Sequence, residues 1–128
     1  MVRTLTALSA TALTCSVSFG ASNALAGGNA ANGADLFNRC TICHSAASGG
    51  GNRIGPNLFG VVGRKAGTFA GYSYSLAMTR SGITWNEAIL TKYLMSPSTV
   101  VPGTKMTFAG FQQQQQAMDA AAYLATLK

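Results

Sequence analysis

The sequence predicts a small all-α protein with three to five helices. Three observations support this class. Helix-forming segments recur along the 128 residues, no segment alternates apolar and polar residues for long enough to make a strand, and a glycine-rich loop covers 45–71. A chain of this length is a single domain by default. Because such a long loop is unusual in a compact domain, something other than regular structure must organise it.

The N-terminal segment, 1–26, is typical of a secretory signal peptide. It has one basic residue, Arg3, an apolar and hydroxylated run, and a small-x-small cleavage pattern at its end. A membrane anchor is the alternative, but the run is shorter than the roughly 20 apolar residues that a spanning helix needs. Cys15 stands in a poor context for lipid attachment, and we expect it to be removed with the peptide. The remaining 27–128 form the mature domain.

Two short helices are expected in the first half of that domain. The first covers 34–40, where Asp35 near the start suits the helix dipole and Gly33 shares a face with Phe37. The second covers 73–80 and is closed by Gly82. The loop between them is punctuated by Gly, Asn, Pro and Ser.

Two longer helices are expected in the second half of the domain. In 84–97, Thr84 and Glu87 have the spacing of a capping box, and Pro97 prevents continuation. Residues 98–111 are expected to be extended and rich in turns. The terminal helix, 112–128, begins with a glutamine run that reads as a solvated first turn, and its apolar face comprises Met118, Ala121, Ala122, Leu124 and Ala125.

The chain is basic, with nine Lys and Arg residues against three acids and a formal net charge of +6. Removal of Arg3 with the signal peptide would leave +5. The other basic residues stand singly or as one pair, so the sequence indicates no polybasic arm and we expect no nucleic acid partner. A solubilising surface charge and a patch that steers an acidic partner both remain open. The eight basic residues that remain without Arg3 are Arg39, Arg53, Arg64, Lys65, Arg80, Lys92, Lys105 and Lys128.

Cys40, Cys43 and His44 form a Cys-x-x-Cys-His motif, the attachment sequence of c-type haem. Each thiol adds to a vinyl group, and His44 binds the iron. Three alternatives are weaker: a zinc site lacks a fourth ligand, a thioredoxin-like pair lacks its βαβ context, and a plain disulfide leaves the histidine unexplained. One covalently bound haem also accounts for the long loop, because a flat apolar cofactor becomes the core that the loop wraps.

The sixth ligand of the iron decides between electron transfer and catalysis. The chain has no second histidine, and most of its methionines stand where helix packing explains them. Met106 instead follows a turn fixed by Pro102 and Gly103, which favours it as the ligand opposite His44, the alternative being that it fills a gap. A thioether stabilises reduced iron, so the pattern predicts a soluble single-electron carrier and not an enzyme. A small haem peroxidase or gas-binding protein, and a metal-binding or interaction module without haem, are the rival classes.

The chain resembles class I cytochrome c of the mitochondrial type, and most of all the exported bacterial cytochromes c2. The resemblance covers 31–128. Its motifs, in order, are "CTICH", "GPNLFGVVGRKAG", "GYSYS", "SGITW", "KYL", "PGTKM" with "FAG", and "AAYLATLK". It implies the small cytochrome c fold wrapped around one haem, and a monomeric carrier of a respiratory chain that is located in the periplasm.

The resemblance also implies roles for individual residues. Pro56 matches the residue whose carbonyl accepts the Nδ1 proton of the histidine ligand. Tyr93 and Thr104 match the hydroxyl groups beside the methionine ligand. Gly33 and Phe37 match the residues by which the first helix contacts the last helix, near Tyr123. Three further residues match donors to the haem propionates: Arg64, Tyr74 and Trp85.

Three departures from the family pattern stand out. Met78 replaces a frequent asparagine near a propionate, Asn52 replaces a frequent loop histidine, and glutamines replace lysines in the terminal segment. The resemblance implies partners among membrane redox complexes, with a donor of cytochrome bc1 type and an oxidase or photosynthetic reaction centre as acceptor. The departures leave four cations as docking candidates near the haem edge: Arg39, Arg53, Lys65 and Lys105.

Overall fold

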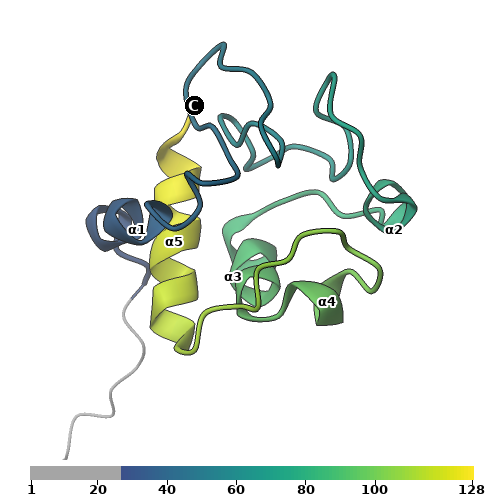
Figure 1. Cartoon of the computed structure of the whole chain (residues 1–128). Helices are drawn as coiled ribbons and strands as arrows, with labels where there is room; N and C mark the ends of the chain where they lie inside the picture. Colours follow the sequence, from purple (N-terminus) through teal and green to yellow (C-terminus); the bar gives the residue numbers. More distant parts are fainter. Residues whose placement is uncertain (1–26) are drawn as a thin grey trace, which may run out of the picture.

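The structure, a computed structural model, describes residues 27–128, and the predicted signal peptide with Cys15 lies outside them (Figure 1). Five helices follow one another in the described part, with no strand there and one isolated bridge between Lys65 and Thr84. This confirms the all-α class. No helix within 27–128 has both the length and the apolarity to cross a bilayer.

Helix α1 (Ala30–Phe37) begins earlier than the sequence predicted. The side chain of Asn29 caps it by accepting from the N–H groups of Ala31 and Asn32. The expectation for Asp35 was wrong, because Asp35 lies near the end of the helix and its first turn has no acidic residue.

Helix α2 (Leu76–Arg80) lies within its predicted range and is capped by Ser75, whose hydroxyl accepts from the N–H of Met78. Helix α3 (Glu87–Met95) is also present, but the predicted capping residue was wrong. Asn86 accepts from the N–H of Ile89 at 2.8 Å, while Thr84 is engaged in the bridge with Lys65. An asparagine directly before the helix is the better-placed acceptor.

Helix α4 (Pro97–Val100) was missed, because the segment was expected to be extended. Pro97 ends one helix and starts the next: its missing N–H suits a first helical position. Helix α5 (Gln114–Thr126) is the terminal helix, and its buried face is rotated from the predicted one. Ala121 and Leu124 belong to both faces, but Ala117 and Ala120 are buried in place of Met118, Ala122 and Ala125, which are only half-buried.

Helix α5 is the centre of the fold, with α1 crossing it on one side and α3 packing on the other (Figure 1). Gly33 permits the close crossing: a Cβ there would lie 2.0 Å from the carbonyl oxygen of Asp119. The rings of Phe37 and Tyr123 pack nearby, with centroids 5.2 Å apart and planes tilted by 49°. The expected contact of the first and last helices is therefore present.

The buried apolar residues come from all parts of this arrangement. They are Phe37, Val61, Ala66, Trp85, Leu90, Tyr93, Leu94, Val101, Phe111, Ala117, Ala120, Ala121 and Leu124. The loop chain between α1 and α2 arches away from the helices in Figure 1. Residues of this loop and of the helices line a common cavity, which is the candidate site.

Candidate functional site

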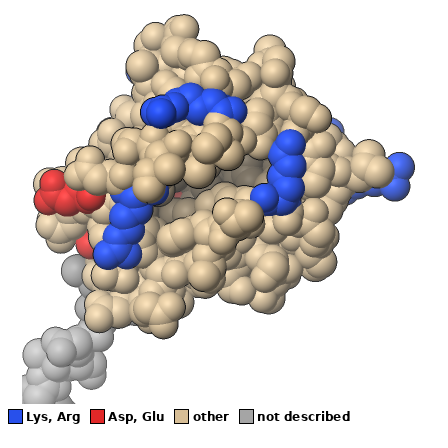
Figure 2. All heavy atoms as spheres, viewed as in Figure 1, with Lys and Arg blue, Asp and Glu red and all other residues tan. Residues whose placement is uncertain are grey.

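A cavity of about 380 Å³ lies between the loops and helices α3 and α5. Figure 2 shows a hollow on this face with basic side chains on several sides of it. Ten of the residues singled out from the sequence line the cavity, although they are spread over 67 positions of the chain: Cys40, Cys43, His44, Pro56, Arg64, Tyr74, Trp85, Tyr93, Thr104 and Met106. The fold thus brings the predicted site residues to one place.

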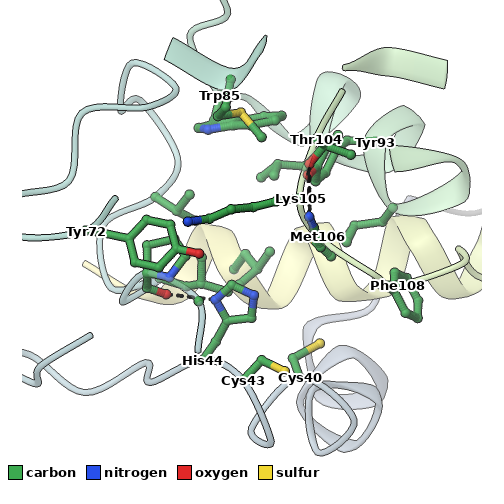
Figure 3. A pocket seen from close by; sticks show the side chains of 18 of the residues that line it. Cys40, Cys43, His44, Tyr72, Trp85, Tyr93, Thr104, Lys105, Met106 and Phe108 are labelled. Atoms are coloured by element: carbon green, nitrogen blue, oxygen red, sulfur yellow. Dashed lines mark hydrogen bonds between the residues drawn. The ribbon is translucent and has the colours of Figure 1, made fainter. Parts of the chain in front are cut away.

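The segment of Cys40, Cys43 and His44 is a helical turn that continues past the end of α1. The N–H of Cys43 donates to the carbonyl oxygen of Cys40 at 3.0 Å, and the N–H of His44 donates to the same oxygen at 2.8 Å. Both thiols are free and half-buried, and Figure 3 shows them beside His44 at one side of the pocket. Burial raises the pKa of the Cys40 thiol, as does nearby Cys43, against the opposing effect of Arg39.

The imidazole of His44 is held in one orientation. Its Nδ1 lies 2.7 Å from the carbonyl oxygen of Pro56, and because a carbonyl only accepts, Nδ1 carries the proton and Nε2 keeps a free lone pair. Burial lowers the pKa of His44, while the bond to Pro56 acts in the opposite direction. Neutral imidazole with a free Nε2 is the form that binds a metal.

Gly55 fixes how closely the chain approaches this ring, a role that the sequence did not reveal. A Cβ on Gly55 would lie 2.3 Å from Cε1 of His44 and 2.7 Å from its Nδ1. The N–H of Gly55 also donates to the carbonyl oxygen of Cys43 at 2.7 Å. The sequence does contain a signal for this role, namely a glycine directly before Pro56, because glycine is often found where the backbone approaches another group closely.

Asn57 is a second residue that the sequence analysis missed. Its side chain is 1% exposed, and its amide donates to the carbonyl oxygens of Ala47 at 2.9 Å and Gly50 at 2.7 Å. Its own side-chain oxygen accepts from the N–H of Phe59 at 2.7 Å. Asn57 therefore ties together the loop that carries Pro56, which accounts for how a segment without regular structure stays in place.

Met106 enters the cavity from the extended chain after α4, and Figure 3 shows it beside Thr104 and Tyr93. The hydroxyl of Tyr93 lies 3.0 Å from Oγ1 of Thr104 and donates to Sδ of Met106 at 3.5 Å. The N–H of Met106 donates to Oγ1 of Thr104 at 3.3 Å. Burial raises the pKa of Tyr93, although the hydrogen bond with Thr104 acts in the opposite direction. The raised pKa keeps the phenol protonated and able to donate.

A polar group lies at another wall of the cavity. The guanidinium of Arg64 donates to the carbonyl oxygens of Asn57, at 2.9 Å, and of Phe59. Tyr74 lines the same wall, and burial raises the pKa of its phenol while the charge of Arg64 acts against that shift. Trp85 is 7% exposed and packs on Tyr93 with ring centroids 5.0 Å apart. Met78 also lines the cavity, which places this departure from the family pattern directly at the site.

The rim of the cavity is basic and partly apolar. Arg39, Lys65 and Lys105 are exposed residues that line it. Arg53 is exposed as well but does not line the cavity, and its guanidinium donates to the carbonyl oxygen of Thr41 at 2.8 Å. Two large apolar side chains on the lining, Ile42 and Ile54, are 70% and 73% exposed. The sequence analysis did not predict this exposed apolar surface.

The donor set fits a c-type haem. Two thiols one helical turn apart, a neutral imidazole with a free Nε2 and a thioether converge on one largely apolar space. The polar wall offers donors for acidic substituents, and the imidazole and the thioether offer ligands for a metal. The combination therefore fits a flat apolar group that carries both.

Comparison with known proteins agrees with this fit. A sequence model of the family described as cytochrome c matches residues 30–128. The chain is 44% identical to cytochrome c2 of Blastochloris viridis over 96 residues, which is 75% of this chain and 76% of that protein. It is 46% identical to cytochrome c of Gibberella zeae over 101 residues, 78% of this chain and 95% of the relative.

A solved structure shows the same similarity in three dimensions. The structure of cytochrome cH from Methylobacterium extorquens superposes with a TM-score of 0.72 at 44% sequence identity. The match covers 77% of this chain and 99% of that one. The described helices and the loops around the cavity thus have a counterpart in a known fold.

Proposed function

Because the chain belongs to the cytochrome c family, we propose that it is a single-electron carrier in which His44 and Met106 ligate the iron of its haem. Proteins of this family carry one haem c, and Cys40 and Cys43 occupy its attachment motif. They transfer electrons and are not enzymes in the usual sense. The bound haem supplies an iron that gains and loses one electron.

The observation that carries the proposal is the convergence of His44 and Met106 on one cavity from distant parts of the chain. Each has a hydrogen-bond partner that orients it, Pro56 for His44 and Tyr93 for Met106. Two protein ligands leave no coordination position for oxygen or peroxide. The Met106 thioether favours the reduced metal and so raises the reduction potential.

The polar wall serves the acidic edge of the haem in this proposal. Arg64, Tyr74 and Trp85 each have N–H or O–H donors, and all three line the cavity. A carboxylate buried without donors is costly, so such groups stabilise it by donating hydrogen bonds. Thr104 has a different task, since its hydroxyl links Tyr93 to the backbone of Met106.

The basic rim would serve the approach of redox partners. Arg39, Lys65 and Lys105 carry positive charge on the lining of the cavity, and Arg53 is exposed outside it. Apolar Ile42 and Ile54 are exposed on the same lining. Opposite charges steer an encounter and apolar contacts hold it briefly. We assign as partners a membrane complex of cytochrome bc1 type as donor and a terminal oxidase or photosynthetic reaction centre as acceptor, within a respiratory chain or its photosynthetic counterpart. The protein would act as a monomer.

We further propose that 1–26 is a signal peptide and that 27–128 is the mature monohaem domain, located in the periplasm. The small-x-small pattern before Gly27 and the similarity to bacterial cytochromes c2 support this assignment. Expression with export in a bacterium that attaches haem should give a red protein whose N-terminal residue is Gly27. A mature chain that retains Arg3 would contradict it.

Visible spectroscopy tests the ligands. The oxidised protein should show the weak long-wavelength charge-transfer band of a methionine-bound ferric haem, and the reduced protein should bind carbon monoxide slowly. Met106→Leu should abolish the band and accelerate carbon monoxide binding. Met78→Leu is the matched control, because Met78 also lines the cavity and should leave both properties unchanged. Rapid binding to the wild-type protein would instead indicate an open iron and a gas-binding or peroxidase role.

A further inference from the structure

The peptide group between Pro56 and Asn57 makes a hydrogen bond at each end. Its carbonyl oxygen accepts from Nδ1 of His44 at 2.7 Å. Its N–H donates to Oδ1 of Asn52 at 3.1 Å. The imidazole of His44 and the side chain of Asn52 are therefore the two ends of one chain of hydrogen bonds that runs through a single amide plane.

Asn52 is itself held at a defined orientation. Its Nδ2 donates to the carbonyl oxygen of Ala70 at 3.0 Å while its Oδ1 faces the N–H of Asn57. Exchange of the two amide atoms would set two donors against each other and two acceptors against each other. The neighbours thus determine which way the amide points.

The central peptide group is held firmly as well. The buried side chain of Asn57 donates to Ala47 and Gly50, so the peptide before it has little freedom to tilt. A bond to Asn52 therefore acts mainly by polarising this peptide and not by moving it. Successive hydrogen bonds through an amide strengthen one another by roughly 10–30% each.

We propose that Asn52 is a positioning residue that, through the Pro56–Asn57 peptide, strengthens the hydrogen bond from His44 and so lowers the reduction potential of the iron. The inference rests on the proposed ligation by His44. A stronger bond at Nδ1 makes the imidazole a more basic ligand, and a more basic ligand stabilises the oxidised metal. Asn52 has no ionisable group, so this contribution does not change with pH.

The same side chain also bridges two loops, and the experiment must separate the two roles. Tyr72 provides the control, because its hydroxyl donates to the carbonyl oxygen of Ile54 at 3.0 Å and so joins the same two segments. Tyr72→Phe breaks that bridge without touching the peptide that follows Pro56. Asn52→Leu removes both the bridge to Ala70 and the acceptor for the N–H of Asn57.

The test compares holoproteins by redox titration and by NMR of the His44 Nδ1 proton in the reduced state. Asn52→Leu should raise the midpoint potential and shift that proton upfield, as a weakened hydrogen bond does, while Tyr72→Phe should leave both values at wild type. An unchanged potential and resonance in Asn52→Leu, or equal changes in both variants, would overturn the inference. If the wild-type protein lacks a histidine-bound haem, the proposed function fails instead.

A measurement on the wild-type protein covers the case in which Asn52→Leu does not fold. The 15N nucleus of Asn57 should show scalar coupling to Cγ of Asn52 across their hydrogen bond, and Nδ1 of His44 should couple to the carbonyl carbon of Pro56. Both couplings together support the chain of bonds. Absence of the first, with the second present, would show that Asn52 does not reach this peptide.

Discussion

The backbone N–H of Asn29 donates a hydrogen bond of 2.7 Å to Oδ1 of Asp119, a residue 90 positions further along the chain. Asp119 is 5% exposed and also accepts from the side chains of Gln115 at 2.9 Å and Asn32 at 3.4 Å. One carboxylate on α5 thus receives donors from the start of α1 and from its own helix. This contact joins the two helices whose crossing organises the fold.

Asp119→Ala should destabilise the protein by about 1–3 kcal/mol, because it leaves the N–H of Asn29 without its charged acceptor. Asp119→Asn, which keeps an acceptor but no charge, should lose less. Urea unfolding of both variants at neutral pH gives the comparison. Equal stability of wild type and Asp119→Ala would show that water replaces the carboxylate without loss.

The same carboxylate predicts the pH dependence of stability. Burial acts to raise the pKa of Asp119, but the hydrogen bonds from Asn29, Gln115 and Asn32 outweigh it and hold the pKa below its ordinary value of 3.8. The stabilisation is therefore complete above pH 3.8 and is lost as the pH falls through the lower pKa of the folded state. Unfolding followed through this acid range should be less pH-dependent in Asp119→Asn than in wild type.

Gly55→Ala should disturb the histidine ligand directly. The added Cβ would meet the ring of His44 at 2.3 Å, so either the ring or the loop must move, at a cost of about 1–3 kcal/mol. We expect a lower unfolding midpoint and a fraction of high-spin haem in the visible spectrum. Gly51→Ala is the control, since its Cβ would meet nothing within 4 Å. Identical spectra for the two variants would contradict the close approach at Gly55.

Tyr93→Phe should lower the reduction potential by about 20–40 mV. The lost bond from the phenol to Sδ of Met106 leaves a more electron-rich sulfur, which favours the oxidised iron. A difference of about 0.5–1 kcal/mol between oxidation states corresponds to this shift for one electron. Redox titration measures it, and Tyr123→Phe tests whether any missing phenol has the same effect, because Tyr123 packs on Phe37 and does not line the cavity.

Neutralisation of the basic rim should slow electron transfer with an acidic partner. At low ionic strength we expect Lys65→Gln and Lys105→Gln each to reduce the association rate by about twofold to tenfold. Arg80→Gln is the control, because Arg80 is exposed on α2 and does not line the cavity. The differences should vanish at high salt, where the charges are screened. Stopped-flow measurement of reduction by a purified partner gives these rates.

The sequence was most informative where the chemistry is local. Cys40, Cys43 and His44 stand within one turn, so their spacing alone predicted the haem that the family similarity supports. Helix ends were less predictable. Thr84 and Asn86 both offer capping oxygens two positions apart, and the start of α3 at Glu87 decides between them, because Asn86 directly precedes it and accepts from the N–H of Ile89.

Residues that act across the chain could not be assigned by periodicity. Asn57 looks like an ordinary loop asparagine in the sequence, and Asn52 stood out only because it replaces a frequent loop histidine. Yet Asn57 is buried among carbonyl groups, and Asn52 bonds to Ala70. Their roles depend on which loops meet. The family resemblance predicted the contact of Pro56 with His44, because such a contact is carried by matching motifs and not by local propensity.

The site is divided unevenly along the chain, with both thiols and the imidazole inside five consecutive residues and Met106 far downstream. Everything that thioether formation requires from the polypeptide is thus available before the molecule has folded. If haem is attached as proposed, an enzyme that attaches it would need to recognise only these five residues and no finished binding surface. The downstream sulfur would then close around a cofactor that is already anchored, so that folding completes the coordination sphere after the covalent step.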